Sequence, residues 1–248
     1  MRFLSSEKNQ HLKIDQDITY KKINHCYLTF KMTEKAYYER YWNQQLGSSG
    51  EGFAESPPEW NERDLERILS FCSGTVKGSV LDAGCGDGFF ANQLASLSEV
   101  KNITGVDISE KPLDIARKRF PNNQFLQGSL NEISFEDESF DSIVMTEVIE
   151  HLVDIDGTLE NLAKFLRPGG SLLITTSDFN WLKCVIISMF YFEKYFYPTN
   201  PHIRFFTKTT LEKVLATHGL KVIKYSWNGS YLGLMPKGQM ILAEKSTT

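Results

Sequence analysis

Short apolar runs alternate with amphipathic segments along most of this chain. The runs SVLDAG, FDSIVMTEV and SLLITTS have the length and composition of buried strands, whereas segments such as GTLENLAKFL have helical periodicity. Strands that alternate with helices of this length form βαβ units, and helices then cover both faces of a parallel sheet. The pattern predicts an α/β fold built on a doubly wound, mostly parallel sheet of seven strands.

Two more strand candidates, LKVIKYSW and GQMILAEK, follow the last helical segment and are joined by a short loop. A parallel pair needs a crossover connection of about a dozen residues or more. This loop is too short for such a crossover, so we expect the two strands to pair antiparallel. The sheet should therefore contain one antiparallel strand, the C-terminal one.

A glycine-rich loop follows the first apolar run, in the stretch VLDAGCGDGFF. Ligands of doubly wound sheets bind beyond the carboxyl ends of the strands, and glycines let a ligand approach the main chain closely. The third glycine comes one residue earlier than in the dinucleotide fingerprint G-x-G-x-x-G. Asp82 and Asp87 would repel a pyrophosphate, but they would attract the ammonium and sulfonium groups of S-adenosylmethionine.

Asp107 ends the second strand candidate, about 20 residues beyond the loop, where an acidic side chain typically binds ribose hydroxyls. Any adenosine cofactor would use such an acid. The alternative is a glycine-rich turn followed by an aspartate that caps a helix. Together, the loop and the acid favour a cofactor site.

Composition narrows the class of protein. The net charge is −4 and Lys and Arg do not cluster, so we expect no nucleic-acid partner. Cys26, Cys72, Cys85 and Cys184 lack CxxC spacing, which is typical of reduced thiols rather than disulfides or a zinc site. There is no signal-peptide core and no apolar run of roughly 20 residues that could span a membrane. A cytoplasmic protein is the expectation.

Five stretches in succession carry a family resemblance: VLDAGCGDG, ITGVDIS, FDSIVMTEVIEHL, FLRPGGSLLITT and HIRFFTKTTLEKVLATHGL. They resemble the motifs of class I S-adenosylmethionine-dependent methyltransferases, and in particular the branch around the ubiquinone-pathway O-methyltransferases. The resemblance covers roughly residues 60–245. It implies the Rossmann-like methyltransferase fold with S-adenosylmethionine as cofactor.

The resemblance also implies which residues bind the cofactor. The three loop glycines would line the methionine end, Asp107 the ribose, and Thr146 the region of the sulfonium. Where the family often has an acid for the adenine amino group, this chain has Ser129 followed by Leu130. The complete set that we expect at the cofactor is Asp82, Gly84, Gly86, Gly88, Asp107, Ile108, Ser129, Leu130 and Thr146.

The stretch EVIEH after the fourth strand candidate holds the chemical candidates. Methyl transfer from a sulfonium needs alignment of the reacting groups and, for a hydroxyl acceptor, removal of a proton. His151 is the expected general base, with Glu150 beside it as a second catalytic residue. A structural histidine with capping glutamates is the alternative.

A divalent metal is a further expectation at the same place. In a helical turn Glu147, Glu150 and His151 would share one face, and His202 could complete a ligand set for a hard or borderline cation. Such a metal would orient an acceptor oxygen and lower its pKa. His151 acting alone as a base remains open.

Two parts are expected along the chain: an N-terminal cap over residues 1–58 and a methyltransferase domain over residues 59–248. The domain should carry an aromatic lid insertion at about residues 179–206. Within it, Cys184–Phe192 is apolar almost all round, so it should be buried, paired with another subunit, or in contact with lipid or an apolar substrate. Tyr37–Trp42 could close the pocket from the other side.

The functional expectation is methyl transfer to a small-molecule acceptor, most simply to an oxygen of an aromatic, quinol-like, lipidic or natural-product substrate. One alternative is an RNA 2′-O-methyltransferase, since small-RNA enzymes of that kind share the E-x-x-E-H pattern with a later histidine. Another is a non-catalytic partner subunit that binds S-adenosylmethionine. A monomer and a homodimer both remain open, as does peripheral contact with a membrane.

Overall fold

A seven-stranded sheet organises the computed structural model, which describes residues 34–45, 61–198, 200–231 and 235–247. Its order is β3-β2-β1-β4-β5-β7-β6. The strands β1 to β5 pair parallel, and β7 pairs antiparallel with both β5 and β6. The predicted fold class is confirmed. The strands are β1 Gly78–Ala83, β2 Val100–Asp107, β3 Gln124–Gln127, β4 Phe140–Thr146, β5 Leu166–Ser177, β6 Leu220–Tyr231 and β7 Met235–Lys245.

The two C-terminal strands form the predicted antiparallel pair, and the antiparallel strand β7 lies inside the sheet. Tyr231 ends β6 and Met235 begins β7, so the chain can only reverse direction between them. The strand β7 then fits between β5 and β6, and β6 becomes the edge. No helix of the described residues is long and apolar enough to cross a membrane.

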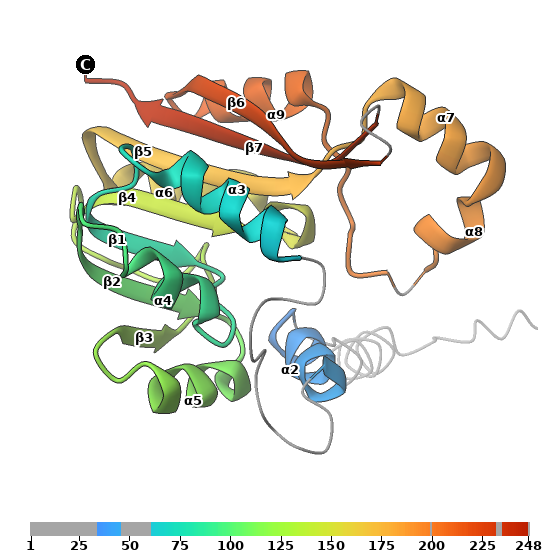
Figure 1. Cartoon of the computed structure of the whole chain (residues 1–248). Helices are drawn as coiled ribbons and strands as arrows, with labels where there is room; N and C mark the ends of the chain where they lie inside the picture. The colour runs from blue at the N-terminus through green and yellow to red at the C-terminus, as the bar shows by residue number, and fades with distance from the viewer. Residues whose placement is uncertain (1–33, 46–60, 199, 232–234, 248) are drawn as a thin grey trace, which may run out of the picture.

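Helices cover both faces of the sheet (Figure 1). The helices α3 (Glu62–Cys72), α4 (Phe89–Leu94) and α5 (Glu110–Arg119) pack on one face, and α6 (Ile155–Phe165) and α9 (Lys208–Thr217) on the other. Each face has its own apolar core, because successive residues of a strand point to opposite faces. In β5, Leu172 and Ile174 enter the α6 core and Leu173 enters the α3 core.

Three helices lie beyond the carboxyl ends of the strands: α2 (Glu34–Gln45), α7 (Trp181–Phe190) and α8 (Phe192–Tyr195) (Figure 1). The helix α2 is attached to α5, where Glu39 Oε1 accepts a hydrogen bond from the backbone N–H of Glu110 at 2.8 Å. The expected domain boundary at residues 58–59 and Cys26 lie outside the described residues.

The strand order reverses at β1, which lies between β2 and β4. The chain leaves β1 for β2 and β3 on one side, and returns to the other side for β4 and β5. In open α/β sheets a crevice forms at this reversal, beyond the carboxyl ends of the strands, and ligands bind there. The glycine-rich loop follows β1 directly, so the fold places it at this crevice.

Candidate active site

A cleft of about 1240 Å³, part of it open to solvent, lies where the strand order reverses. The ends of β1, β2 and β4 form its floor, and α2 forms the opposite wall. The lining residues are Glu34, Tyr38, Tyr41, Trp42, Gly84, Cys85, Gly86, Asp87, Phe89, Phe90, Asp107, Ile108, Gly128, Ser129, Leu130, Asn131, Thr146, Glu147, Val148, His151, Leu152, Asp154 and Thr158.

Asp107 ties the glycine loop to the end of β2. Its carboxylate accepts hydrogen bonds from the backbone N–H of Gly86 at 3.0 Å and of Ser109 at 2.9 Å. Burial nevertheless raises the pKa of Asp107 to about 6, although these hydrogen bonds act to lower it. A carboxylate offers about four lone-pair positions, so Asp107 can still accept bonds from two ligand hydroxyls.

Two of the predicted cofactor residues do not line the cleft, Asp82 and Gly88. Gly88 begins α4 with a φ of 76°, and a Cβ at this position would lie 2.8 Å from Phe125 and 2.9 Å from Ala116. Its lack of a side chain therefore serves close packing at the start of α4, and contact between Gly88 and the ligand stays a prediction.

Asp82 is fully buried behind the loop. Neither carboxylate oxygen makes a well-formed hydrogen bond with the described residues, although the backbone of Ala91 lies near. Burial first, and then the charge of Asp107, raise its pKa to about 7. Asp82 therefore lies behind the cleft rather than in its lining, and its contact with the cofactor stays a prediction.

The segments after β2 and β3 also line the cleft. Ile108 after β2, and Ser129 and Leu130 after β3, line it as expected, together with Gly128 and Asn131. The Ser129 hydroxyl donates to the side-chain oxygen of Asn131, so it is already engaged within the chain. Asn131 lies in the sequence stretch QGSLNE, but only the structure shows that it lines the cleft and accepts a hydrogen bond from Ser129.

Thr146 ends β4 at the cleft, and Glu147 follows in a left-handed conformation with a φ of 53°. Glu147 is held to β5, because its N–H donates to the Thr175 carbonyl at 3.0 Å and the Thr175 hydroxyl donates to its carboxylate at 2.8 Å. The expectation of one helical turn from Glu147 to His151 is wrong. Only Ile149–His151 forms a short 3-10 turn.

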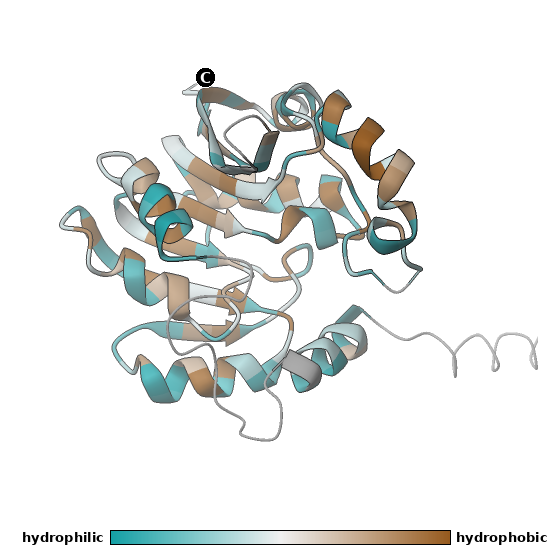
Figure 2. Cartoon of the chain, turned by 45° about the vertical axis from the view of Figure 1, so that its right-hand side comes forward, coloured by the Kyte–Doolittle hydropathy of each residue, from teal (hydrophilic) through white to brown (hydrophobic). Residues whose placement is uncertain are grey.

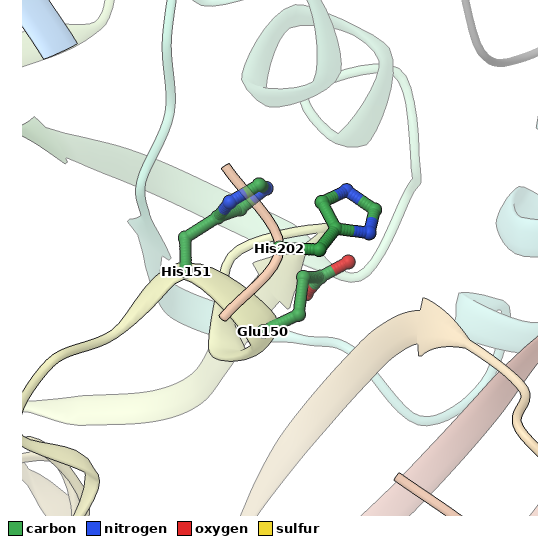
Figure 3. A group of neighbouring side chains, drawn as sticks. All are labelled: Glu150, His151 and His202. Atoms are coloured by element: carbon green, nitrogen blue, oxygen red, sulfur yellow. The ribbon is translucent and has the colours of Figure 1, made fainter. Parts of the chain in front are cut away.

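Glu150, His151 and His202 nevertheless come together (Figure 3). One ligand atom from each lies within 4.8 Å of the others, whereas Glu147 is not part of this group. The histidines meet because backbone N–H groups of Ile203 and Arg204 both donate to the Glu150 carbonyl. His202 was predicted from sequence at this place although 50 residues separate it from the turn.

Glu150 does not line the cleft but lies behind it, fully buried. Glu147 and Thr176 lie beside its carboxyl group, yet neither makes a well-formed hydrogen bond with it, and no other described residue does. Burial, and then repulsion from Glu147, hold the pKa of Glu150 well above its ordinary range. A buried acid without a partner is costly unless something positive reaches it.

His151 lines the cleft, and one of its ring nitrogens is already hydrogen-bonded within the chain. Its Nδ1 lies 2.9 Å from the Pro201 carbonyl, and a carbonyl only accepts, so we assign the proton to Nδ1. The Nε2 atom therefore carries a lone pair. Burial lowers the pKa of His151 to about 4, so the ring is neutral at physiological pH. The pKa of the neighbouring His202 is also lowered by burial.

The helix α2 supplies the wall that the sequence indicated only through its aromatic stretch YYERYW. The Tyr38 hydroxyl donates to the His151 carbonyl at 3.4 Å, and Trp42 approaches Gly86 so closely that a Cβ there would lie 2.8 Å from its ring. Glu34 and Asp154 add carboxylates to the same region, and no described lysine or arginine lines the cleft. The lining is acidic and aromatic.

The aromatic segment at residues 179–206 contributes no lining residue to the cleft. It touches the site only through Pro201, His202 and their neighbours. The expectation that Cys184–Phe192 could be buried in the core is wrong, since Val185, Met189 and Phe190 are exposed.

Comparison with known proteins decides the family. The profile described as "Methyltransferase domain" matches residues 58–225, well over half of the chain. The chain belongs to this family. The prediction of a class I S-adenosylmethionine-dependent methyltransferase is confirmed at the level of the family.

Individual relatives agree with this assignment. A probable S-adenosylmethionine-dependent methyltransferase of Mycolicibacterium smegmatis is 34% identical over 113 residues, which are 46% of this chain and 42% of that protein. The ubiquinone biosynthesis O-methyltransferase of Coxiella burnetii is 30% identical over 157 residues, covering 60% of this chain and 66% of that protein. The matched region thus spans less than two thirds of each relative.

A solved structure of a methyltransferase-like protein from Bacillus halodurans has the same fold. Its TM-score is 0.61, with 18% identity, covering 74% of this chain and 99% of that one. At this identity the likeness concerns the fold alone. The Rossmann-like methyltransferase architecture is therefore shared, while the acceptor must be argued from the cleft itself.

Proposed function

We propose that this protein transfers the methyl group of S-adenosylmethionine to an oxygen atom of a small-molecule acceptor. The observation that carries the proposal is that the neutral His151 lines the same cleft as the glycine loop and Asp107, and that its Nε2 atom has a lone pair. A base and a cofactor site in one cleft are what methylation of a hydroxyl requires.

The cofactor would lie along the floor of the cleft. Asp107 would accept hydrogen bonds from the ribose hydroxyls, and the backbone at Gly84 and Gly86 would contact the methionine end. Ile108 and Leu130 offer apolar surfaces for the adenine ring, with Ser129 beside them. The acidic lining complements the positive sulfonium, because opposite charges attract more strongly in a partly buried cleft than in water.

The acceptor would enter between α2 and the turn at His151. Its hydroxyl oxygen attacks the methyl carbon, the bond between carbon and sulfur breaks, and the electron pair remains on sulfur as S-adenosylhomocysteine forms. The hydroxyl proton passes to Nε2 of His151, while the Pro201 carbonyl holds the ring in position. Tyr38, Tyr41 and Trp42 would contact an aromatic or otherwise apolar acceptor.

A divalent cation is the alternative to this base, because it would occupy the same Nε2 atom of His151. Glu150, His151 and His202 offer a carboxylate and two neutral imidazoles within 4.8 Å, a ligand set suited to a borderline cation. Burial keeps both imidazoles neutral, which is the form that binds a metal, and a cation would stabilise the ionised form of Glu150, whose pKa burial raises. When bound it would lower the pKa of the acceptor hydroxyl. Glu147 was expected in this set and lies outside it.

The acceptor class rests on the cleft and on one relative. The Coxiella burnetii relative is named as an O-methyltransferase of ubiquinone biosynthesis. An RNA acceptor is disfavoured, since phosphate binding relies on lysine and arginine and none among the described residues lines the cleft. We therefore favour an uncharged aromatic, quinol-like or lipidic acceptor.

A labelled-methyl transfer assay over a panel of phenols, catechols, quinols and short RNAs tests the proposal. We expect methyl ethers of one uncharged class, formed with wild-type protein and lost in His151→Ala. Methylation of RNA alone would contradict the proposal and favour an RNA 2′-O-methyltransferase. Tight binding of S-adenosylmethionine without any methyl transfer over the panel would favour a non-catalytic partner subunit.

Chelation separates the two versions of the mechanism. If a cation takes part, dialysis against a chelator should abolish activity, and added metal should restore it. Undiminished activity after chelation would leave His151 acting alone as the general base.

A further inference from the structure

Exposed apolar side chains gather on the segment after β5. The described part of the chain exposes fourteen large apolar side chains, and eleven of them lie between Trp181 and Phe205. Phe190 is 70% exposed, Met189 68% and Trp181 76%. In Figure 2 the helix α7 carries the strong brown of hydrophobic residues on the outside of the molecule. A patch of this kind marks an interaction surface.

The helix α7 buries its charged residue and exposes most of its apolar ones, the reverse of an ordinary surface helix. Lys183 is its one charged residue, and it is 3% exposed. Its Nζ donates to the Lys237 carbonyl at 2.9 Å and lies 5.1 Å from the centre of the Phe179 ring. The charged side chain therefore anchors the helix to the domain together with the buried Ile187, while most of its apolar side chains are exposed. An apolar partner would remove this surface from water.

Charge indicates the kind of partner. The chain as a whole has a net charge of −4, yet residues 181–208 contain, besides the buried Lys183, three basic residues and one acid, Glu193. Lys194 and Lys208 are exposed, and Lys208 lies 3.6 Å from Glu212. Aromatic and aliphatic side chains combined with basic residues are the composition of helices that lie in a membrane interface. The helix α7 spans 10 residues, too short to cross a bilayer, so contact would lie in the plane of the surface.

We propose that the apolar shelf, defined as Trp181, Met189, Phe190, Phe192 and Tyr197, docks onto an anionic lipid bilayer. A second copy of this chain is the less favourable occupant. In a two-fold dimer the same surface meets itself, so two segments of net positive charge would face each other. Phosphate groups of an anionic bilayer complement this charge instead.

The shelf is continuous with the candidate active site. Beyond α8 the chain returns through Pro201 and Arg204, which bond to His151 and to the Glu150 carbonyl. The helices α7 and α8 also lie beyond the carboxyl ends of the strands, at the same edge as α2 (Figure 1). Docking at the shelf would thus place this edge of the molecule next to the lipid surface.

Vesicle flotation tests the proposal without any acceptor or cofactor, so its failure would leave the proposed function untouched. The probes are phosphatidylcholine vesicles with and without phosphatidylserine. We expect wild-type protein to float with the anionic vesicles, more weakly with neutral ones, and a blue shift of tryptophan emission on binding. The double variant M189E/F190E should lose about tenfold or more in partitioning.

Matched variants complete the design. Ile223→Glu also places a charge on an exposed apolar residue, but on β6, and should bind vesicles like wild type. Lys194→Glu should weaken binding to anionic vesicles and spare neutral ones. The proposal is overturned if neither vesicle binds wild-type protein, or if M189E/F190E binds as wild type does. A concentration-dependent dimer in sedimentation, disrupted by M189E/F190E and without vesicle binding, would assign the shelf to a second copy.

Discussion

The cleft and the apolar shelf depart from ordinary burial in opposite directions. At the cleft the chain buries acids: Asp82 is fully buried and Glu150 is 1% exposed, both without well-formed hydrogen bonds to the described residues. At the shelf it exposes aromatic side chains, such as Phe190 and Trp181, and buries the lysine of the same helix. Most buried polar groups in proteins are paired, and most large apolar patches are covered.

The difference shows what each region lacks. Unpaired buried acids favour a positive ligand, which S-adenosylmethionine or a metal cation would supply. Exposed aromatic residues favour an apolar partner. The unpaired buried acids lower the stability of the isolated chain, which is common at functional sites, whereas the exposed aromatic side chains leave apolar surface in water.

The largest expected effect comes from His151→Ala. Removing a general base should lower kcat by about 10² to 10⁴-fold, while the affinity for S-adenosylmethionine stays unchanged because Asp107 and the glycine loop are intact. Single-turnover kinetics and calorimetry measure the two quantities. His218→Ala is the matched control, since this histidine pairs with Asp156 away from the cleft. An unchanged turnover rate would remove His151 from the mechanism.

Asp82→Asn should stabilise the cofactor-free protein at neutral to alkaline pH. The folded pKa of Asp82 is about 7, raised from 3.8, so its favourable contribution is present below 3.8 and is lost as pH rises through 7. The variant should therefore gain on the order of 4 kcal/mol in the free energy of unfolding above this range and little at acidic pH.

Urea denaturation at several pH values measures this gain as the difference between the two proteins. The difference is needed because the pKa of His151 is lowered to about 4, so this residue makes the folded state more stable as pH rises, whereas Asp82 makes it less stable. Equal unfolding free energies for both proteins across the range would show that the buried carboxylate of Asp82 does not destabilise the folded protein.

Asp107→Ala should weaken binding of S-adenosylmethionine by about 2–3 kcal/mol, because a buried carboxylate that accepts two ligand hydroxyls makes strong hydrogen bonds. Part of the loss would come from the glycine loop, whose Gly86 N–H also loses its acceptor. Calorimetry measures the affinity, with exposed Asp114→Ala as the control. An affinity equal to that of wild type would remove Asp107 from the cofactor site.

The smallest effect is expected at the shelf. Phe190→Ala should change the free energy of unfolding by less than about 0.5 kcal/mol, since its side chain is already in water. Phe165→Ala, in the core under α6, should cost about 3–5 kcal/mol. Comparable losses in the two variants would show that the shelf is part of the fold rather than a surface kept for a partner.

The sequence alone was enough for the architecture. Alternating strand and helix patterns, together with the short link between β6 and β7, predicted the doubly wound sheet with its antiparallel strand. The glycine loop and Asp107 could be placed at the cleft because the end of a strand and the reversal of strand order are properties of the local pattern and the connections.

Tertiary structure decided what the side chains at the site do. Glu147 departs from the expected helical turn because its backbone is held to Thr175 of β5, a contact between residues far apart in sequence. Gly88 serves packing against Phe125, and the wall from α2 depends on how a separate helix docks. The outward direction of the apolar face of α7 depends on where Lys183 finds its acceptor. Periodicity records which residues share a face, whereas only the folded chain determines what that face meets.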